Sequence, residues 1–254
     1  MPLKVLTFNI AHGAPFLVPA PFLRPPGSLR RTLDGVAALL VHEAADVVAL
    51  QEVDRKCLFS GGVDQVAHIA EQAGYAHVLH GVHLRVPGVF AQGTALLSRH
   101  PLHEPEVGLF QGDRAVDKGF VVASIHWEGH DVDMVSVHLD PFSPQRRQRQ
   151  ARRLAEALER RHRPGRLRVL MGDLNSSEGN PGATVERLCE AARLRSYEPG
   201  AGGPTYTTTR PRQRLDWILV SPELRYLHHA RVHSVLSDHF PVVAELDWAG
   251  SPQG

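Results

Sequence analysis

Polar side chains suited to binding cations and moving protons stand beside the apolar segments of this sequence. Carboxylates, amides and imidazoles begin or end six of these segments, and the residues concerned are Asn9, Gln51, Glu52, His138, Asp140, Asp173, Asn175, Asp216, Asp238 and His239. One such residue alone is more often a turn or cap residue. Six placements on separate strands predict instead that the strand ends converge on one rim and form a common site.

These residue types favour one kind of chemistry. Carboxylate and amide oxygens suit a hard cation such as Mg²⁺ or Mn²⁺. The sequence has no HExxH motif and no cysteine cluster, so a closed zinc site is not expected. A divalent cation beside imidazoles and a carboxylate base fits hydrolysis of a phosphate ester, because the cation and an imidazolium stabilise phosphoryl charge while the base activates water. The absence of GxSxG and GxxxxGK[ST] motifs argues against a serine hydrolase and a P-loop nucleotidase.

The spacing of apolar residues predicts strands and helices mixed along the whole chain. Strands are expected near 3–8, 46–51, 76–80, 94–98, 120–127, 132–138, 166–172, 215–220, 230–235 and 241–247. Helices are expected at 28–43, 64–74, 143–161 and within 181–193. Many of the later strands follow one another with no helix between them, which favours largely antiparallel pairing.

The composition is that of a globular protein, with 43% hydrophobic and 22% charged residues in a chain of 254. No linker or repeat divides it, so one domain is expected over 1–249, with a tail at 250–254. A net charge near +1 does not mark the whole chain as a nucleic-acid or membrane binder. No signal-peptide pattern or membrane-spanning apolar run is present, and there are only two cysteines, so a cytoplasmic monomer is expected.

The segment 13–27, GAPFLVPAPFLRPPG, contains five prolines and predicts an irregular loop. Its large apolar side chains have two interpretations. They either pack over the core or form a lip beside the site. As a lip, the loop would contact an apolar part of a substrate or a lipid surface.

The helix expected at 143–161 is strongly basic, with arginines at 146, 147, 149, 152 and 153. Such a helix can follow the phosphate backbone of a nucleic acid. Its apolar stripe, which includes Ala151, Leu154 and Leu158, also fits an ordinary amphipathic helix with a solvated basic face. Aromatic residues make up only 6% of the chain, which leaves few side chains to stack on bases.

Seven short motifs occur along the chain in a particular order: TFNIAHG, LQEVD, GTALLS, VSVHLD, MGDLNS, RLDWILVS and SDHFPV. From about residue 3 to residue 247 their order and spacing resemble the endonuclease/exonuclease/phosphatase superfamily. This fold class includes DNase I, exonuclease III-type repair nucleases, inositol polyphosphate 5-phosphatases and neutral sphingomyelinases. The resemblance implies an α+β fold, a four-layer α-β-β-α sandwich of two mainly antiparallel sheets. It also implies a phosphoester substrate and Mg²⁺ or Mn²⁺ as cofactor.

The resemblance assigns Glu52 as the main metal ligand. Asn9 would support the metal or the phosphate, and Asp238 would be a ligand or lie directly beside the metal. Repair nucleases carry a second acidic residue two positions after the motif asparagine, where this chain has Ala11. His12 follows it, and it is either a further metal or phosphate contact or an ordinary loop histidine.

The same resemblance assigns the remaining roles. Asp173 would orient or deprotonate the attacking water, and Asn175 would hold the phosphate. Asp216 would pair with His239 and favour its protonated form near the scissile phosphate. His138 matches the histidine that binds phosphate in the DNase and sphingomyelinase branches.

At two further positions the resemblance does not assign a role. Many members have asparagine after the glycine of a GNALLS-type motif, where this chain has Thr94, so one expected amide is unaccounted for. Asp140 succeeds the motif histidine by two residues and is a further acidic candidate at the same strand end.

Three functions compete at this point. The first is a phosphodiesterase or phosphatase acting on a small or lipid-linked phosphate ester, which His138, Ala11 and the loop 13–27 favour. The alternative is a nuclease that uses the same site, for which the basic helix 143–161 is the best support. A binding module without activity would be expected to have lost motif residues such as Glu52, and they are all present.

Overall fold

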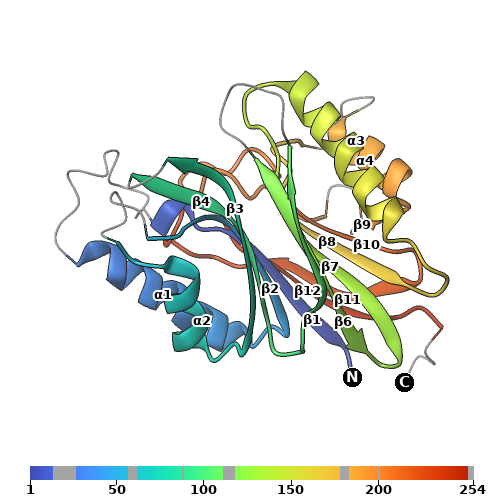
Figure 1. The fold of residues 1–254 in the computed structure, drawn as a ribbon, viewed down its shortest axis with the longest axis horizontal. Coiled ribbons are helices and arrows are strands. Elements are labelled where there is room, and N and C mark those ends of the chain that lie inside the picture. Colours follow the sequence, from blue (N-terminus) through green and yellow to red (C-terminus); the bar gives the residue numbers. More distant parts are fainter. Residues whose placement is uncertain are drawn as a thin grey trace.

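Two β-sheets stacked face to face form the centre of the molecule, and a pair of helices covers each outer face (Figure 1). The computed structural model describes residues 1–13, 27–56, 62–86, 89–110, 118–177, 183–198 and 201–250. Within them, this arrangement confirms the predicted four-layer α-β-β-α sandwich.

Each sheet has six strands. The first sheet, in the order β11-β12-β1-β2-β4-β3, contains β1 (Leu3–Asn9), β2 (Val47–Asp54), β3 (His77–Val86), β4 (Phe90–Ser98), β11 (Leu224–Arg231) and β12 (Val242–Trp248). The second, in the order β5-β6-β7-β8-β10-β9, contains β5 (His103–Leu109), β6 (Gly119–Trp127), β7 (His130–His138), β8 (Leu167–Asp173), β9 (Arg195–Ser196) and β10 (Asp216–Val220). The helices are α1 (Ser28–Glu43), α2 (Gln65–Ala73), α3 (Pro144–Arg160) and α4 (Thr184–Ala192), with one 3₁₀ turn at Ala11–Gly13.

The core has three apolar layers, and strand β1 contributes to two of them. Its side chains alternate between the two faces of the sheet. Leu3 and Val5 belong to the cluster between the sheets, whereas Leu6 and Phe8 belong to the cluster beneath α1 and α2. A third cluster lies between the second sheet and α3 and α4. The core therefore holds the central strands rigidly from both sides.

Antiparallel pairing dominates among the described strands, as predicted, but each sheet also contains one parallel pair. The pairs are β1–β2, connected through α1, and β7–β8, connected through α3. Parallel strands end at the same edge of a sheet. Asn9 consequently lies opposite Gln51, and His138 lies opposite Asp173.

The strand predicted at 230–235 was placed too far along the chain. The structure has β11 at Leu224–Arg231, because its partner β12 begins only at Val242, which pairs with Arg231. Strand β5 was not predicted. It is an edge strand with mostly exposed residues, so it lacks the apolar pattern that identifies a buried strand.

Two predicted segments fall largely outside the described residues. Of the loop 13–27 only Gly13 and Gly27 are described, and of the tail 250–254 only Gly250. Among the helices that the structure does describe, none combines the length and the apolar character needed to cross a membrane.

Candidate active site

The carboxyl ends of the parallel strand pairs meet at one cleft of about 470 Å³. Seven of the residues singled out from the sequence line it together: Asn9, Glu52, His138, Asp173, Asn175, Asp238 and His239. Strand β10 runs antiparallel to β8 and starts at this edge, so its first residue, Asp216, lies opposite Asp173. The convergence predicted from six separate segments is therefore a consequence of strand direction and register.

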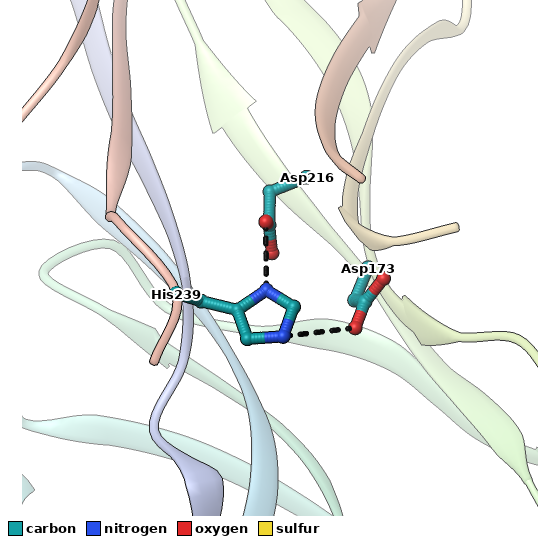
Figure 2. A group of neighbouring side chains, drawn as sticks. All are labelled: Asp173, Asp216 and His239. Carbon is teal, nitrogen blue, oxygen red and sulfur yellow. Dashed lines mark hydrogen bonds and ion pairs between the residues drawn. The ribbon is translucent and has the colours of Figure 1, made fainter. Parts of the chain in front are cut away.

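His239 lies between two aspartates (Figure 2). Its Nδ1 is 2.8 Å from Asp216 Oδ2, and its Nε2 is 3.8 Å from Asp173 Oδ2. Burial lowers the pKa of His239, but the charges of Asp216 and Asp173 outweigh it and raise the pKa to about 10. The ring is therefore an imidazolium at neutral pH, with Nδ1 held by Asp216 and Nε2 facing Asp173. The ring of Tyr206 covers it at a centroid distance of 4.8 Å.

Asp173 is held by hydrogen bonds to both of its oxygens. Asn9 Nδ2 donates to Oδ2 over 3.0 Å, and the backbone N–H of Asn175 donates to Oδ1 over 2.9 Å. Burial, together with the nearby charge of Asp216, raises the pKa of Asp173 to about 7, although the His239 cation opposes this. The carboxyl group is fixed in orientation and is able to take up a proton near neutral pH.

Glu52 projects into the cleft from an irregularity in β2. It has a φ of 52°, and the pairing of β2 with β4 shifts register between Gln51 and Val53. Such a bulge turns a side chain away from the regular alternation of a strand. The Glu52 oxygens lie 3.4 Å from His12 Nε2, 3.5 Å from Lys118 Nζ and 3.8 Å from His138 Nε2. Burial raises the pKa of Glu52, but the charges of His12 and Lys118 outweigh it and lower the pKa to about 2.

His12 belongs to a second imidazole–carboxylate pair that the sequence only half revealed. Its Nδ1 lies 2.9 Å from Asp54 Oδ1, and Asp54 was not among the predicted site residues. Gln65 ties the pair to α2, because it accepts a hydrogen bond from Asp54 N and donates one to the His12 carbonyl. His12 Nε2 lies 3.4 Å from Glu52 Oε2, so this pair borders Glu52.

Lys118 was missed by sequence reasoning. Its Nζ lies 3.5 Å from Glu52 Oε1 and 3.0 and 3.2 Å from the two ring nitrogens of His138. Burial and the Lys118 charge hold the pKa of His138 well below its usual value, so this imidazole is neutral. The available signal was its place directly before strand β6, at one more strand end on the same rim.

Asp140 does not line the cleft. Its carboxylate accepts hydrogen bonds from the backbone N–H groups of Phe142 and Ser143 and from Arg146 Nη1. These contacts fix the turn that leads into α3. Arg147, on the first turns of that helix, lines the cleft and donates to the carbonyl of Asp140.

Thr94 occupies the position where a family asparagine was expected, and it is not among the residues that line the 470 Å³ cleft. Its Oγ1 lies 2.8 Å from His83 Nε2 and donates to the Ser136 carbonyl over 3.4 Å. With Glu52, Lys118 and His138 it lines a cavity of about 10 Å³ behind the cleft, roughly the size that one water needs.

The carboxylate oxygens of Glu52 are ligands of the kind that a hard divalent cation prefers. Glu52 is ionised and accepts no hydrogen bond from any described residue, so its lone pairs are available. Asn9 and Asp238 add an amide and a carboxylate to the same cleft. Asp173, Asp216 and His239 can also bring one ligand atom each within 4.8 Å of one another, but Asp216 and His239 already bond to each other.

Comparisons with known proteins agree with this geometry. Residues 6–239 match the family described as endonuclease/exonuclease/phosphatase. An endonuclease/exonuclease/phosphatase from Beutenbergia cavernae has a similar structure, with 25% identity over 100% of this chain and 73% of that chain and a TM-score of 0.76. No curated protein matches the sequence.

Two further solved structures share the fold at lower identity. A mannosyl-6-phosphatase from Bacteroides thetaiotaomicron is 16% identical over 97% of this chain and 100% of that chain, with a TM-score of 0.74. A sphingomyelinase C from Streptomyces griseocarneus is 20% identical over 96% of this chain and 99% of that chain, with a TM-score of 0.69.

Proposed function

Because the chain belongs to the endonuclease/exonuclease/phosphatase family, we propose that it is a Mg²⁺- or Mn²⁺-dependent phosphoester hydrolase in which water attacks phosphorus. One observation carries this proposal. A fixed carboxylate, Asp173, and a cationic imidazole, His239, line the same cleft as the ionised Glu52. A base, an acid and a cation site are thus arranged around one space.

Glu52, Asn9 and Asp238 would hold the divalent cation. When bound, it supplies positive charge to the phosphoryl oxygens and makes phosphorus a better target for water. Glu52 is half-buried, is ionised and accepts no hydrogen bond from the described residues, so its oxygens are available to such a cation.

Asp173 would act as the general base. Both of its oxygens are oriented by Asn9 and Asn175, and its pKa of about 7 lets it take a proton from water as the new O–P bond forms. His239 would be the general acid. Its Nε2 proton would pass to the leaving oxygen as the old P–O bond breaks, while Asp216 keeps the ring in place.

Lys118, His138 and Asn175 would bind the other phosphoryl oxygens. Lys118 adds a fixed positive charge beside Glu52. Asn175 Nδ2 donates one hydrogen to the Leu139 carbonyl, which orients the amide and leaves its second hydrogen for a phosphate. Such donors, already in position before the reaction, stabilise charge that develops in the transition state.

We propose a small or lipid-linked phosphate ester as the substrate. The names of a mannosyl-6-phosphatase and a sphingomyelinase C among the structures that share the fold support this class. The nuclease alternative gains little support from the basic helix. Of the helix α3 arginines only Arg147 lines the cleft, and the rest of the helix packs along the outer face of the second sheet (Figure 1).

A hydrolysis panel tests this proposal. The substrates are p-nitrophenyl phosphate, bis-p-nitrophenyl phosphate, sphingomyelin, inositol phosphates, plasmid DNA and RNA, each with Mg²⁺, Mn²⁺ or EDTA. We expect metal-dependent turnover of a small or lipid phosphoester that EDTA abolishes. Nicking of nucleic acid without small-ester turnover would favour the nuclease, and no metal-dependent turnover on any substrate would overturn the proposed reaction.

A further inference from the structure

A second cavity, of about 450 Å³, lies beside the β3–β4 hairpin. Its walls come from that hairpin, from the segment that follows β2, and from the residue that caps α2: Arg55, Lys56, Asp64, His80, Val82, Arg85, Val86, Val89 and Ala91. None of these residues belongs to the catalytic cleft. We call this space the hairpin cavity.

Positive charges outnumber negative charges among the residues that line the hairpin cavity. Arg55, Lys56 and Arg85 are exposed cations on its wall, and Asp64 is its one acidic residue. Asp64 Oδ2 lies 3.7 Å from Arg55 Nε, and within the described residues neither Lys56 nor Arg85 has an ion-pair partner. The neighbouring sequence stretches 57–61 and 87–88 contain no aspartate or glutamate. Within the described part of the chain, two positive charges in one concave space therefore have no ion-pair partner.

The backbone around these cations is fixed by hydrogen bonds. Arg55 N donates to the Ala91 carbonyl over 2.7 Å, and Lys56 N donates to the Val63 carbonyl over 3.2 Å. Arg85 pairs with Ala91 in the β3–β4 ladder. Cationic side chains on a fixed backbone lose less freedom when they bind an anion, and their charged hydrogen bonds to phosphate are strong.

The hairpin cavity also lies close to the proposed reaction centre along the chain. Arg55 follows Glu52 by three residues. At the rise of an extended strand this is a separation of roughly 10 Å. An ester bound at Glu52 could place a second anionic group at the cations of the hairpin cavity without a change in the fold.

From this arrangement we propose that the hairpin cavity binds a second phosphoryl group of the substrate. The inference rests on the proposed hydrolase function and narrows it to esters that carry two or more phosphoryl groups. Lys56 and Arg85 contact the distal group, whereas Arg55 is partly neutralised by Asp64. Charged hydrogen bonds of this kind favour Lys and Arg over neutral side chains.

The test uses a double variant, Lys56→Ala with Arg85→Ala, and a control double variant, Arg152→Ala with Arg160→Ala. The control removes two exposed arginines from α3 and changes the net charge equally. We compare the p-nitrophenyl ester of thymidine 5′-phosphate with that of thymidine 3′,5′-bisphosphate, which carries a second phosphoryl group. Inositol bisphosphate serves as a third substrate that also has two phosphoryl groups but no nucleoside. We expect the cavity variant to raise KM about tenfold or more for the bisphosphates only. An equal change for the monophosphate ester would overturn the proposal.

A binding measurement separates failure of this inference from failure of the proposed reaction. Calorimetry with tripolyphosphate in EDTA needs no turnover. We expect the parent and the control double variant to bind it with equal affinity and the cavity variant to bind it about tenfold more weakly. Equal affinity in all three proteins would overturn the hairpin cavity as a phosphate site. If the affinities differ but no ester is hydrolysed, the anion site stands and the hydrolase assignment falls.

Discussion

Strands β7 and β8 carry buried charges at both of their ends, and the two ends differ sharply. At the start of β7, Asp133 is fully buried and accepts hydrogen bonds from Ser124 Oγ over 2.6 Å and from Arg161 Nη2 over 3.1 Å. Arg166, just before β8, is shared between Asp133 and Glu104. At the opposite end of β8, Asp173 lies 3.8 Å from the His239 cation, and the basic neighbours of Glu52, on β2, lie 3.4 to 3.8 Å from its oxygens.

The comparison shows two uses of a buried charge. One group comprises Asp133, Arg161 and Arg166, and we call it the far-end network. Each of its charges has direct partners within the protein, so removal of one partner would leave a buried charge unpaired and destabilise the fold. At the cleft, charges are held in position by the backbone and by neighbouring amides but are only partly neutralised. That incomplete neutralisation leaves interactions available for a cation, a water molecule and a phosphoryl group.

The largest expected effect is at Asp173. The Asp173→Asn variant keeps the shape of the side chain but removes the base, so kcat for the best substrate should fall by at least about 10³-fold. The unfolding free energy should stay equal to that of the parent or rise, since a buried carboxylate is lost. Steady-state kinetics and urea unfolding measure both quantities. A variant that keeps more than a tenth of the parental kcat would rule out Asp173 as the base.

The matched substitution in the far-end network should lower stability and leave activity nearly unchanged. In Asp133→Asn, Arg161 and Arg166 lose their buried counter-charge, so the unfolding free energy should fall by about 3 kcal/mol. kcat/KM below the unfolding temperature should stay within about twofold of the parent, because Asp133 lies five residues before His138 on the same strand, roughly 16 Å away. A large loss of activity in the folded variant would contradict the division between the two ends.

Lys118 sharpens the comparison, because it is a cation beside Glu52 that sequence reasoning missed. Lys118→Met should lower kcat/KM by about 10- to 100-fold for every phosphoester, since a charge beside the phosphoryl oxygens is removed. Lys118→Arg keeps a positive charge at this position and should retain more of the parental kcat/KM than Lys118→Met does. If both variants match the parent, Lys118 only balances the charge of Glu52.

The pH dependence of stability provides a further test. The pKa of Asp173 is about 7 in the folded chain, above the ordinary aspartate value of 3.8, so its favourable contribution is complete below pH 3.8 and is lost as the pH rises through about 7. The Asp173→Asn variant has no carboxyl group to ionise at this position, so this loss of stability with rising pH is absent from it. In EDTA, the difference in unfolding free energy between variant and parent should move in favour of the variant by about 4 kcal/mol from pH 4 to pH 8. A difference independent of pH would show that Asp173 stays ionised throughout.

The smallest expected effect is at the rim of the cleft. Phe142 lines the cleft and is 79% exposed, so its ring is available to a substrate but adds little to the core. Phe142→Ala should raise KM severalfold for esters with an apolar or ring-containing group and leave kcat and stability unchanged. An equal KM for esters with and without such a group would remove Phe142 from substrate recognition.

The sequence predicted much of this end of the molecule because strand ends are a local feature. Short apolar runs followed by Asn9, Glu52, His138 and Asp173 identify both the strands and the side chains at their tips. Parallel pairing then brings these tips together, and the ordered motifs of the family supply the fold.

What the sequence did not reveal depends on contacts between distant segments. Lys118 meets His138 only because β6 and β7 pair in one particular register, with Gly119 opposite His138. Asp54 contacts His12 because Gln65 of α2 donates a hydrogen bond to the His12 carbonyl and holds the 3₁₀ turn of His12 in place. Asp140 looked like a site residue by its position, but the hydrogen bonds that make it part of a turn come from residues beyond the strand.

The most direct test of the account compares His239→Ala with His126→Ala on bis-p-nitrophenyl phosphate, in Mg²⁺, Mn²⁺ and EDTA. His126 is an exposed histidine on β6, at the end of the molecule away from the cleft. The account predicts metal-dependent turnover in the parent and in His126→Ala, and a loss of at least about 10³-fold in folded His239→Ala. Equal turnover in all three proteins would contradict the assignment of this cleft as the active site.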